Sequence, residues 1–264
     1  MNILIACEES QKVCSEFRKL GHVAYSCDIQ EPSGGHPEWH INDDVLPLLN
    51  GDCTFSTMDG TKHSISGKWD MLIAFPPCTH LALSGAMHFE KKRNDGRQRD
   101  GIEFFCRFFD ADCDRIVIEN PKNIISGGEY IRKWFPDLAE KYKLPRKYSQ
   151  VIHPWMFGDP YCKGTCLWIK GLPNLIPDIT EEPETEWVEY TSKKGKKKRI
   201  QKWYSDAFTD NQKDSAARSR IRSKTFDGIA KAMATQWSNF CELSEDQQTK
   251  LLNLGISHKQ LKLF

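Results

Sequence analysis

A cysteine that directly follows two prolines is the feature of this sequence that most clearly suggests chemistry. It stands in the stretch WDMLIAFPPCTHLALSG, residues 69–85, where an apolar run of strand type leads into Pro76, Pro77 and Cys78. Proline fixes the backbone φ angle, so this turn holds the thiol in place at little entropic cost. Cysteine is commonly a buried packing residue, but packing alone does not require a Pro-Pro turn. We therefore predict that Cys78 is a nucleophile.

A carboxyl group, Glu119, ends a later apolar run in residues 115–121, RIVIENP. A thiolate can add to C6 of a pyrimidine ring, and an acid at ring N3 eases this addition because negative charge builds up there. The addition makes C5 a nucleophile that can accept an electrophilic carbon. Cys78 and Glu119 together predict covalent catalysis on a pyrimidine, whereas Glu119 alone could equally cap a helix.

The elements that must position these two residues follow a strand–helix alternation. Residues 2–7, 22–28, 69–75 and 115–121 are apolar runs of strand type, and residues 10–21 carry apolar side chains at helical spacing. Strands that are apolar throughout favour a parallel sheet covered on both faces. We predict an α/β protein with a doubly wound, mostly parallel, Rossmann-like sheet and a small β-rich insertion.

Polar residues follow each predicted strand at its carboxyl end. Ligands of parallel sheets bind at that edge. The residues concerned are Cys7, Glu8 and Glu9, then Asp28, then Pro76, Pro77 and Cys78, and finally Glu119, Asn120 and Pro121. We expect them to meet at one edge of the sheet.

The chain changes character after Gln150. Residues 178–204 predict a small hairpin whose tip is basic, with Lys193, Lys196 and Lys198 among its cations. Such a tip is either solvated surface or a contact for nucleic acid phosphates. We assign residues 1–177 and 205–241 to the catalytic domain and 242–264 to a C-terminal helical appendage, where Ser244 and Gln247 form a capping-box pattern.

The composition is typical of a soluble globular protein. The 264-residue chain is 39% hydrophobic and 28% charged with a formal net charge of +1, so nucleic acid contacts would depend on local basic patches. It has no apolar run near the ~20 residues of a membrane span, and its N-terminus has no signal-peptide pattern. Its ten cysteines are scattered, which favours reduced thiols. We expect a cytoplasmic protein, monomeric by default, without metal or membrane.

The FPPC and ENP motifs, in this order and after apolar strands, resemble those of the cytosine-5 DNA methyltransferase family. The resemblance covers roughly residues 1–237. It implies a methyltransferase fold, the cofactor S-adenosylmethionine, and methyl transfer to C5 of cytosine in DNA. In that family the Pro-Cys motif holds the nucleophile, here Cys78, and the Glu-Asn motif holds the acid that contacts the flipped cytosine, here Glu119.

The same resemblance implies further contacts. Asp28 corresponds to the acid that binds the ribose hydroxyls of the cofactor, and Asp44 lies near the place of an acid on the adenine amino group. The predicted cofactor contacts are Glu8, Asp28, Ile29, Asp44 and Pro76. The predicted DNA contacts are Arg93 and Arg97 in the loop after the cysteine, Gln150 in the segment SQVIHPWMFGD, and Lys193, Lys196 and Lys198.

This sequence departs from the family in three places. The Phe-x-Gly-x-Gly loop is ACEESQ here, with no glycine between Asn2 and Leu20. Ile152 and Pro154 stand where the family's Gln-x-Arg-x-Arg segment has arginines, and the usual large target-recognition domain is missing. Sequence specificity is therefore expected to be short, weak or absent.

Two other functions fit the same residues. One is an enzyme that acts on free pyrimidine nucleotides, because PPCTH also resembles the Pro-Cys-His motif of thymidylate-synthase-like enzymes. The other is a catalytically silent relative that binds DNA or the cofactor. DNA dependence would separate the first from a DNA methyltransferase, and loss of activity in Cys78→Ser would exclude the second.

Overall fold

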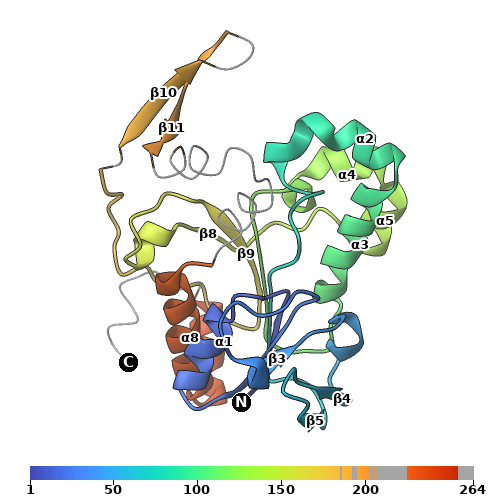
Figure 1. The fold of residues 1–264 in the computed structure, drawn as a ribbon, viewed down its shortest axis with the longest axis vertical. Helices are drawn as coiled ribbons and strands as arrows, with labels where there is room; N and C mark the ends of the chain where they lie inside the picture. Colours follow the sequence, from blue (N-terminus) through green and yellow to red (C-terminus); the bar gives the residue numbers. More distant parts are fainter. Residues whose placement is uncertain (185, 192–194, 203–204, 206–224, 255–264) are drawn as a thin grey trace.

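A seven-stranded mixed sheet forms the centre of the protein (Figure 1). The computed structural model describes residues 1–184, 186–191, 195–202, 205 and 225–254, and the sheet order is β3-β2-β1-β6-β7-β9-β8. The strands of this sheet are β1 (Asn2–Ala6), β2 (Val23–Cys27), β3 (His40–Ile41), β6 (Met71–Ala74), β7 (Ile116–Asn120), β8 (Gln150–Ile152) and β9 (Thr165–Lys170).

The order of the parallel strands reverses beside β1. From β1 the chain adds β2 and then β3 on one side, and later adds β6 and β7 on the other, all parallel. At the far edge β9 is antiparallel to β7, and β8 is antiparallel to β9. In sheets of this kind ligands bind at the carboxyl ends of the strands beside the reversal, here β1 and β6. The predicted α/β class with a mostly parallel sheet is confirmed.

Helices cover both faces of this sheet. The helices are α1 (Lys12–Lys19), α2 (Phe89–Asn94), α3 (Arg97–Phe109), α4 (Gly128–Trp134), α5 (Pro136–Lys141), α8 (Asp227–Cys241) and α9 (Glu245–Asn253), with short 3-10 turns at Pro37–Trp39, Leu46–Leu48, Leu83–His88, Ile124–Ser126 and Pro154–Phe157. Successive residues of β1 belong to two hydrophobic cores, one on each face of the sheet. Leu4 is in the core that contains Phe105 of α3. Ile3 is in the core that contains Phe17 of α1 and Trp237 of α8. Two buried faces explain why the strands are apolar throughout.

The predicted strands 2–7, 22–28, 69–75 and 115–121 correspond to β1, β2, β6 and β7. Sequence patterns did not indicate the short edge strands β3 and β8, or the separate antiparallel pair β4 (Cys53–Ser56) and β5 (Lys62–Ile65). These segments are short and partly polar, so they carry too little hydrophobic periodicity to be recognised.

The basic hairpin exists and stands apart from the central sheet (Figure 1). Its strands β10 (Trp187–Thr191) and β11 (Lys197–Gln201) are antiparallel, and every residue of β10 is exposed. Figure 1 shows it at the same end of the molecule as α2, while β4 and β5 lie at the opposite end.

The C-terminal helix α9 begins with the predicted capping box, in which the Ser244 hydroxyl accepts a hydrogen bond from the Gln247 amide at 3.4 Å. Leu251 of α9 is buried in the core that also contains Trp237 of α8. Helix α9 is therefore joined to the rest of the fold by apolar packing. No helix in the described part of the chain is long and apolar enough to cross a bilayer.

Candidate active site

The two predicted catalytic residues lie at the carboxyl ends of adjacent strands. β6 pairs with β7 in parallel, with Ala74 opposite Ile118, so the Pro-Pro turn and Glu119 leave the sheet at the same level. Asn120 joins the two motifs, because its amide Nδ2 donates to the Pro76 carbonyl at 2.7 Å while its Oδ1 accepts from Asn123 Nδ2 at 2.9 Å. Pro76 and Asn120 are buried, which protects this link from water.

Cys78 begins a tight turn that a lysine braces. The Cys78 carbonyl accepts from the amides of Leu81 and Ala82, at 3.0 and 2.9 Å. The ammonium group of Lys92, from α2, donates to the carbonyl of Thr79, the residue after the cysteine. Cys78 is partly exposed, whereas the Lys92 side chain is buried. The thiol is thus accessible on a turn whose backbone is fixed from two sides.

His80 lies close to this turn and is held neutral. Burial lowers the pKa of His80, and the charges of Lys92 and Arg97 lower it further. Within the described residues its buried Nδ1 atom has no hydrogen-bond partner, while its carbonyl accepts from Gln98 Nε2 at 3.1 Å. A neutral imidazole with a vacant ring nitrogen can accept a proton.

Glu119 lies in a narrow cavity of about 20 Å³. The Thr165 hydroxyl donates to Glu119 Oε1, and Lys163 lines the same cavity. Burial raises the pKa of Glu119, and the Lys163 charge opposes that shift in part. The carboxyl group can therefore hold its proton nearer neutral pH than an exposed glutamate does. A ring can reach it only if the side chains that line the cavity move aside.

Acidic side chains gather at the ends of β1, β2 and β3. Burial raises the pKa of Cys7 well above its ordinary value, and the nearby charges of Asp28 and Asp44 add to this effect. Asp28 is partly exposed, and its Oδ1 accepts from the Gln30 amide at 2.9 Å. Beside it the Ile29 side chain is 79% exposed. Two carboxylates and an exposed apolar side chain thus meet near the strand reversal.

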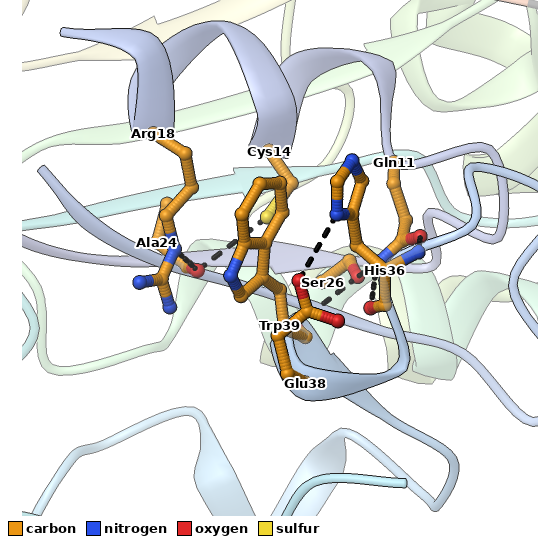
Figure 2. A network of polar contacts seen from close by, with 8 residues as sticks. All are labelled: Gln11, Cys14, Arg18, Ala24, Ser26, His36, Glu38 and Trp39. Carbon is orange, nitrogen blue, oxygen red and sulfur yellow. Dashed lines mark hydrogen bonds and ion pairs between the residues drawn. The ribbon is translucent and has the colours of Figure 1, made fainter. Parts of the chain in front are cut away.

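The β1–α1 loop folds tightly although it has no glycine. Cys7 and Gln11 adopt left-handed backbone angles, with φ of 58° and 56°, which cost energy for side chains other than glycine. Figure 2 shows how Gln11 offsets this cost: its Nε2 donates to the His36 carbonyl at 2.8 Å, and its Oε1 accepts from the His36 amide at 3.0 Å. The His36 ring stacks on Trp39 at 3.8 Å between ring centroids.

Glu8 stabilises the start of α1 and is not exposed at the carboxyl edge of the sheet. Its two carboxylate oxygens accept from the amides of Val13 and Cys14, at 2.6 and 3.2 Å, and so satisfy the first turn of α1. Only 3% of the residue is exposed. The predicted cofactor contact through Glu8 is therefore not supported, because its carboxyl group has almost no accessible surface. Burial also raises the pKa of Glu8 to about 8.

Of two further predicted cofactor contacts, Pro76 is buried and Asp44 is exposed. Pro76 is buried, and its carbonyl is occupied by Asn120, so it shapes the edge instead of presenting a free group. Asp44 is exposed, with Oδ1 accepting from the Leu46 amide at 3.0 Å. It keeps exposed carboxylate surface close to Cys7.

Two arginines predicted to contact DNA, Arg93 and Arg97, already have partners within the protein. Arg93 stacks on Trp134, with its Cζ 4.0 Å from the ring centroid, and donates to the Tyr130 hydroxyl at 2.6 Å. Arg97 is paired with Asp95 through a 3.0 Å hydrogen bond from its Nε.

Gln150 exchanges two hydrogen bonds with the backbone of Leu175, at 2.6 and 2.8 Å. Its amide therefore joins β8 to a loop, and the structure gives no further support to a DNA contact through Gln150. Lys196 and Lys198 are exposed on the hairpin, and Lys198 lies opposite Tyr190. Lys193 lies outside the described residues.

Sequence patterns did not assign a role to four residues around the two candidate side chains: Lys92, Asn120, Lys163 and Thr165. Asn120 was visible only as part of the ENP motif. Lys163 and Thr165 are far from Glu119 along the chain and reach it because β9 pairs with β7. A search for groups of three or more His, Cys, Asp or Glu side chains that could hold a metal found none among the described residues.

The chain was compared with models of protein families and with curated proteins, and neither comparison found a match. The case for a function therefore depends on the side chains at the sheet edge.

Proposed function

We propose that this protein transfers a methyl group from S-adenosylmethionine to C5 of cytosine in DNA, through a covalent bond between Cys78 and C6. The observation that carries the proposal is the pairing of a partly exposed cysteine and a partly buried glutamate at the ends of adjacent parallel strands, whose motifs Asn120 links. The strand reversal beside β1 supports a Rossmann-like methyltransferase fold.

Each residue has one task in this reaction. The Cys78 thiolate bonds to C6 of the flipped base, and the electron pair of the C5–C6 double bond moves toward C5 and N3. Glu119, whose pKa burial raises, donates a hydrogen bond to N3 and stabilises that charge. After C5 has gained the methyl group, a base removes the C5 proton and the thiolate leaves. His80 is the neutral candidate for that base.

The acids at the strand ends fit the cofactor. Asp28 and Asp44 offer carboxylates to ribose hydroxyls and to an adenine amino group, and exposed Ile29 offers an apolar surface to the adenine ring. The cofactor, when bound, supplies an electrophilic methyl group. Figure 1 supports DNA as the substrate, because the exposed basic hairpin lies at the same end of the molecule as α2, which follows the Cys78 turn.

The first test uses methyl-labelled S-adenosylmethionine and cytosine-rich DNA, with wild type and Cys78→Ser side by side. We expect label on C5 of cytosine with wild type and none with the variant, because serine is a far weaker nucleophile toward C6. The DNA is digested to nucleosides and the label is located by mass. Equal labelling by both proteins would exclude Cys78, and label on free dCMP but not on DNA would favour a nucleotide-modifying enzyme.

A further inference from the structure

We propose that Lys92 supplies the positive charge that stabilises the thiolate of Cys78. The proposal rests on the proposed function only for the role of the thiolate as a nucleophile. The property it concerns, the pKa of the Cys78 thiol, can be measured without DNA or cofactor. Neither the sequence motif nor the resemblance assigns a role to this lysine.

The position of Lys92 in α2 directs its side chain inward. Phe89 and Lys92 are three residues apart and therefore lie on one face of the helix, and both are buried. Lys91 lies on the opposite side and is exposed. A lysine is rarely buried unless a partner or a function compensates for its desolvation.

The ammonium group of Lys92 ends beside the cysteine turn. It donates to the Thr79 carbonyl, one residue after Cys78, and lies 3.7 Å from the place a Cβ on Gly85 would occupy. A Cβ at Gly85 would be in ordinary van der Waals contact with the lysine tip. Burial lowers the pKa of Lys92, Arg97 lowers it further, and the charge of Cys78 acts in the opposite direction. Because this coupling is reciprocal, the ammonium group favours the thiolate as the thiolate favours the ammonium group.

Among the described residues, the other charged groups that act on this turn do not replace Lys92. Arg97 acts on the same turn, but its guanidinium is paired with Asp95. His80 is on the same loop, and burial together with Lys92 and Arg97 lowers its pKa, so it is neutral near pH 7. Asp95 and Asp100 oppose that effect on His80. Lys92 is therefore the cation without a paired carboxylate among these groups.

The test measures the rate at which each thiol reacts with iodoacetamide as a function of pH, by peptide mass spectrometry. The thiol proton goes to solvent, the thiolate sulfur bonds to carbon, and iodide leaves, so the rate follows the thiolate fraction. In wild type we expect the Cys78 midpoint clearly below the ~8.5 of an ordinary thiol. In Lys92→Met, which keeps the length of the side chain, we expect Cys78 to react about tenfold more slowly at pH 7.

Two variants and three other thiols serve as controls. Lys92→Arg keeps the charge and should retain most of the rate, while Lys91→Met removes the same charge from the exposed side of α2 and should change nothing. Cys162, which is partly exposed, should react alike in all variants. Cys14 and Cys106 are buried, so their reaction with iodoacetamide in a variant would show that the variant is unfolded. If Lys92→Met is unfolded, the proposal is tested by the Cys78 midpoint of wild type and by the rate of Cys78 in Lys92→Arg.

The proposal is overturned if wild-type Cys78 titrates at or above the ordinary value, or if folded Lys92→Met reacts as fast as wild type. It is also overturned if Lys91→Met slows Cys78 equally. A lowered Cys78 midpoint in a protein that methylates nothing would leave this inference standing while removing the proposed function. Methyl transfer by a protein whose Cys78 midpoint is ordinary would support the proposed function and overturn this inference.

Discussion

Burial raises the pKa of Glu119, and the nearby charge of Lys163 opposes that shift. Its carboxyl group faces the Thr165 hydroxyl and Lys163 in a small cavity, and desolvation raises its pKa. A raised pKa means that the protonated form persists to higher pH than it would in water. In the proposed reaction this is the form that can donate a hydrogen bond to ring N3.

Glu119→Gln tests this coupling. The glutamine amide keeps the shape of the side chain and can donate a hydrogen bond, but it cannot transfer a proton to N3. We therefore expect kcat to fall by about 10²- to 10³-fold. Wild-type kcat should fall as pH rises through the raised pKa of Glu119, and this fall should be absent in the variant. The matched control is Glu140→Gln, an exposed carboxyl on α5. An unchanged pH profile in Glu119→Gln would remove Glu119 from the reaction.

At the scale of elements, β1 and α1 are joined by a buried acid. Glu8 accepts from two amides at the start of α1, and burial raises its pKa from 4.5 to about 8. The folded state therefore binds a proton that the unfolded state releases over this range. The resulting stability is complete below the unfolded pKa and is lost as pH rises through the folded pKa.

We expect the free energy of unfolding to decrease by several kcal/mol between pH 5 and 9, since one pKa unit corresponds to about 1.4 kcal/mol. Glu8→Gln should remove this dependence. It should also be less stable at acid pH, because its amide can accept from only one of the two backbone groups. Urea unfolding at several pH values measures both effects. Glu9→Gln, at the partly exposed neighbour, should behave as wild type, and an equal loss of slope there would contradict the assignment.

Across the whole molecule, positive charge is concentrated on the β10–β11 hairpin. The net charge is only +1, yet Lys196, Lys197, Lys198 and Arg199 cluster on the hairpin. Figure 1 places this hairpin and α2 at one end of the molecule and β4–β5 at the other. A local patch of this kind contacts phosphates independently of sequence.

Replacing Lys196 and Lys198 with glutamine should weaken DNA binding and reduce the slope of log K against log salt by about 2, close to 0.9 for each lost phosphate contact. Fluorescence anisotropy with a labelled duplex at several salt concentrations gives this slope. Lys62→Gln, on the hairpin at the opposite end, is the matched control. An unchanged slope in the double variant would make the hairpin a solvated surface element.

Local patterns were sufficient for the main elements and for the two catalytic candidates. β1, β2, β6 and β7 are apolar runs, α1 and α3 show helical spacing, and the Pro-Pro turn before Cys78 is a property of three adjacent residues. The sequence did not predict β3, β8 or the β4–β5 pair, because strands of two to four residues need partners to exist at all.

Only the tertiary structure shows which side chains contact residues that are distant in the sequence. The amide of Gln150 bonds to Leu175 and the ring of Trp134 stacks on Arg93, so polar residues that match a binding pattern instead hold the fold together. Lys92 reaches Thr79, and Thr165 reaches Glu119, because helix and strand packing brings them there. By itself the sequence determined which groups could react, since reactivity belongs to residue type and local turn. Their burial, charge and orientation depend on long-range packing, which local patterns do not encode.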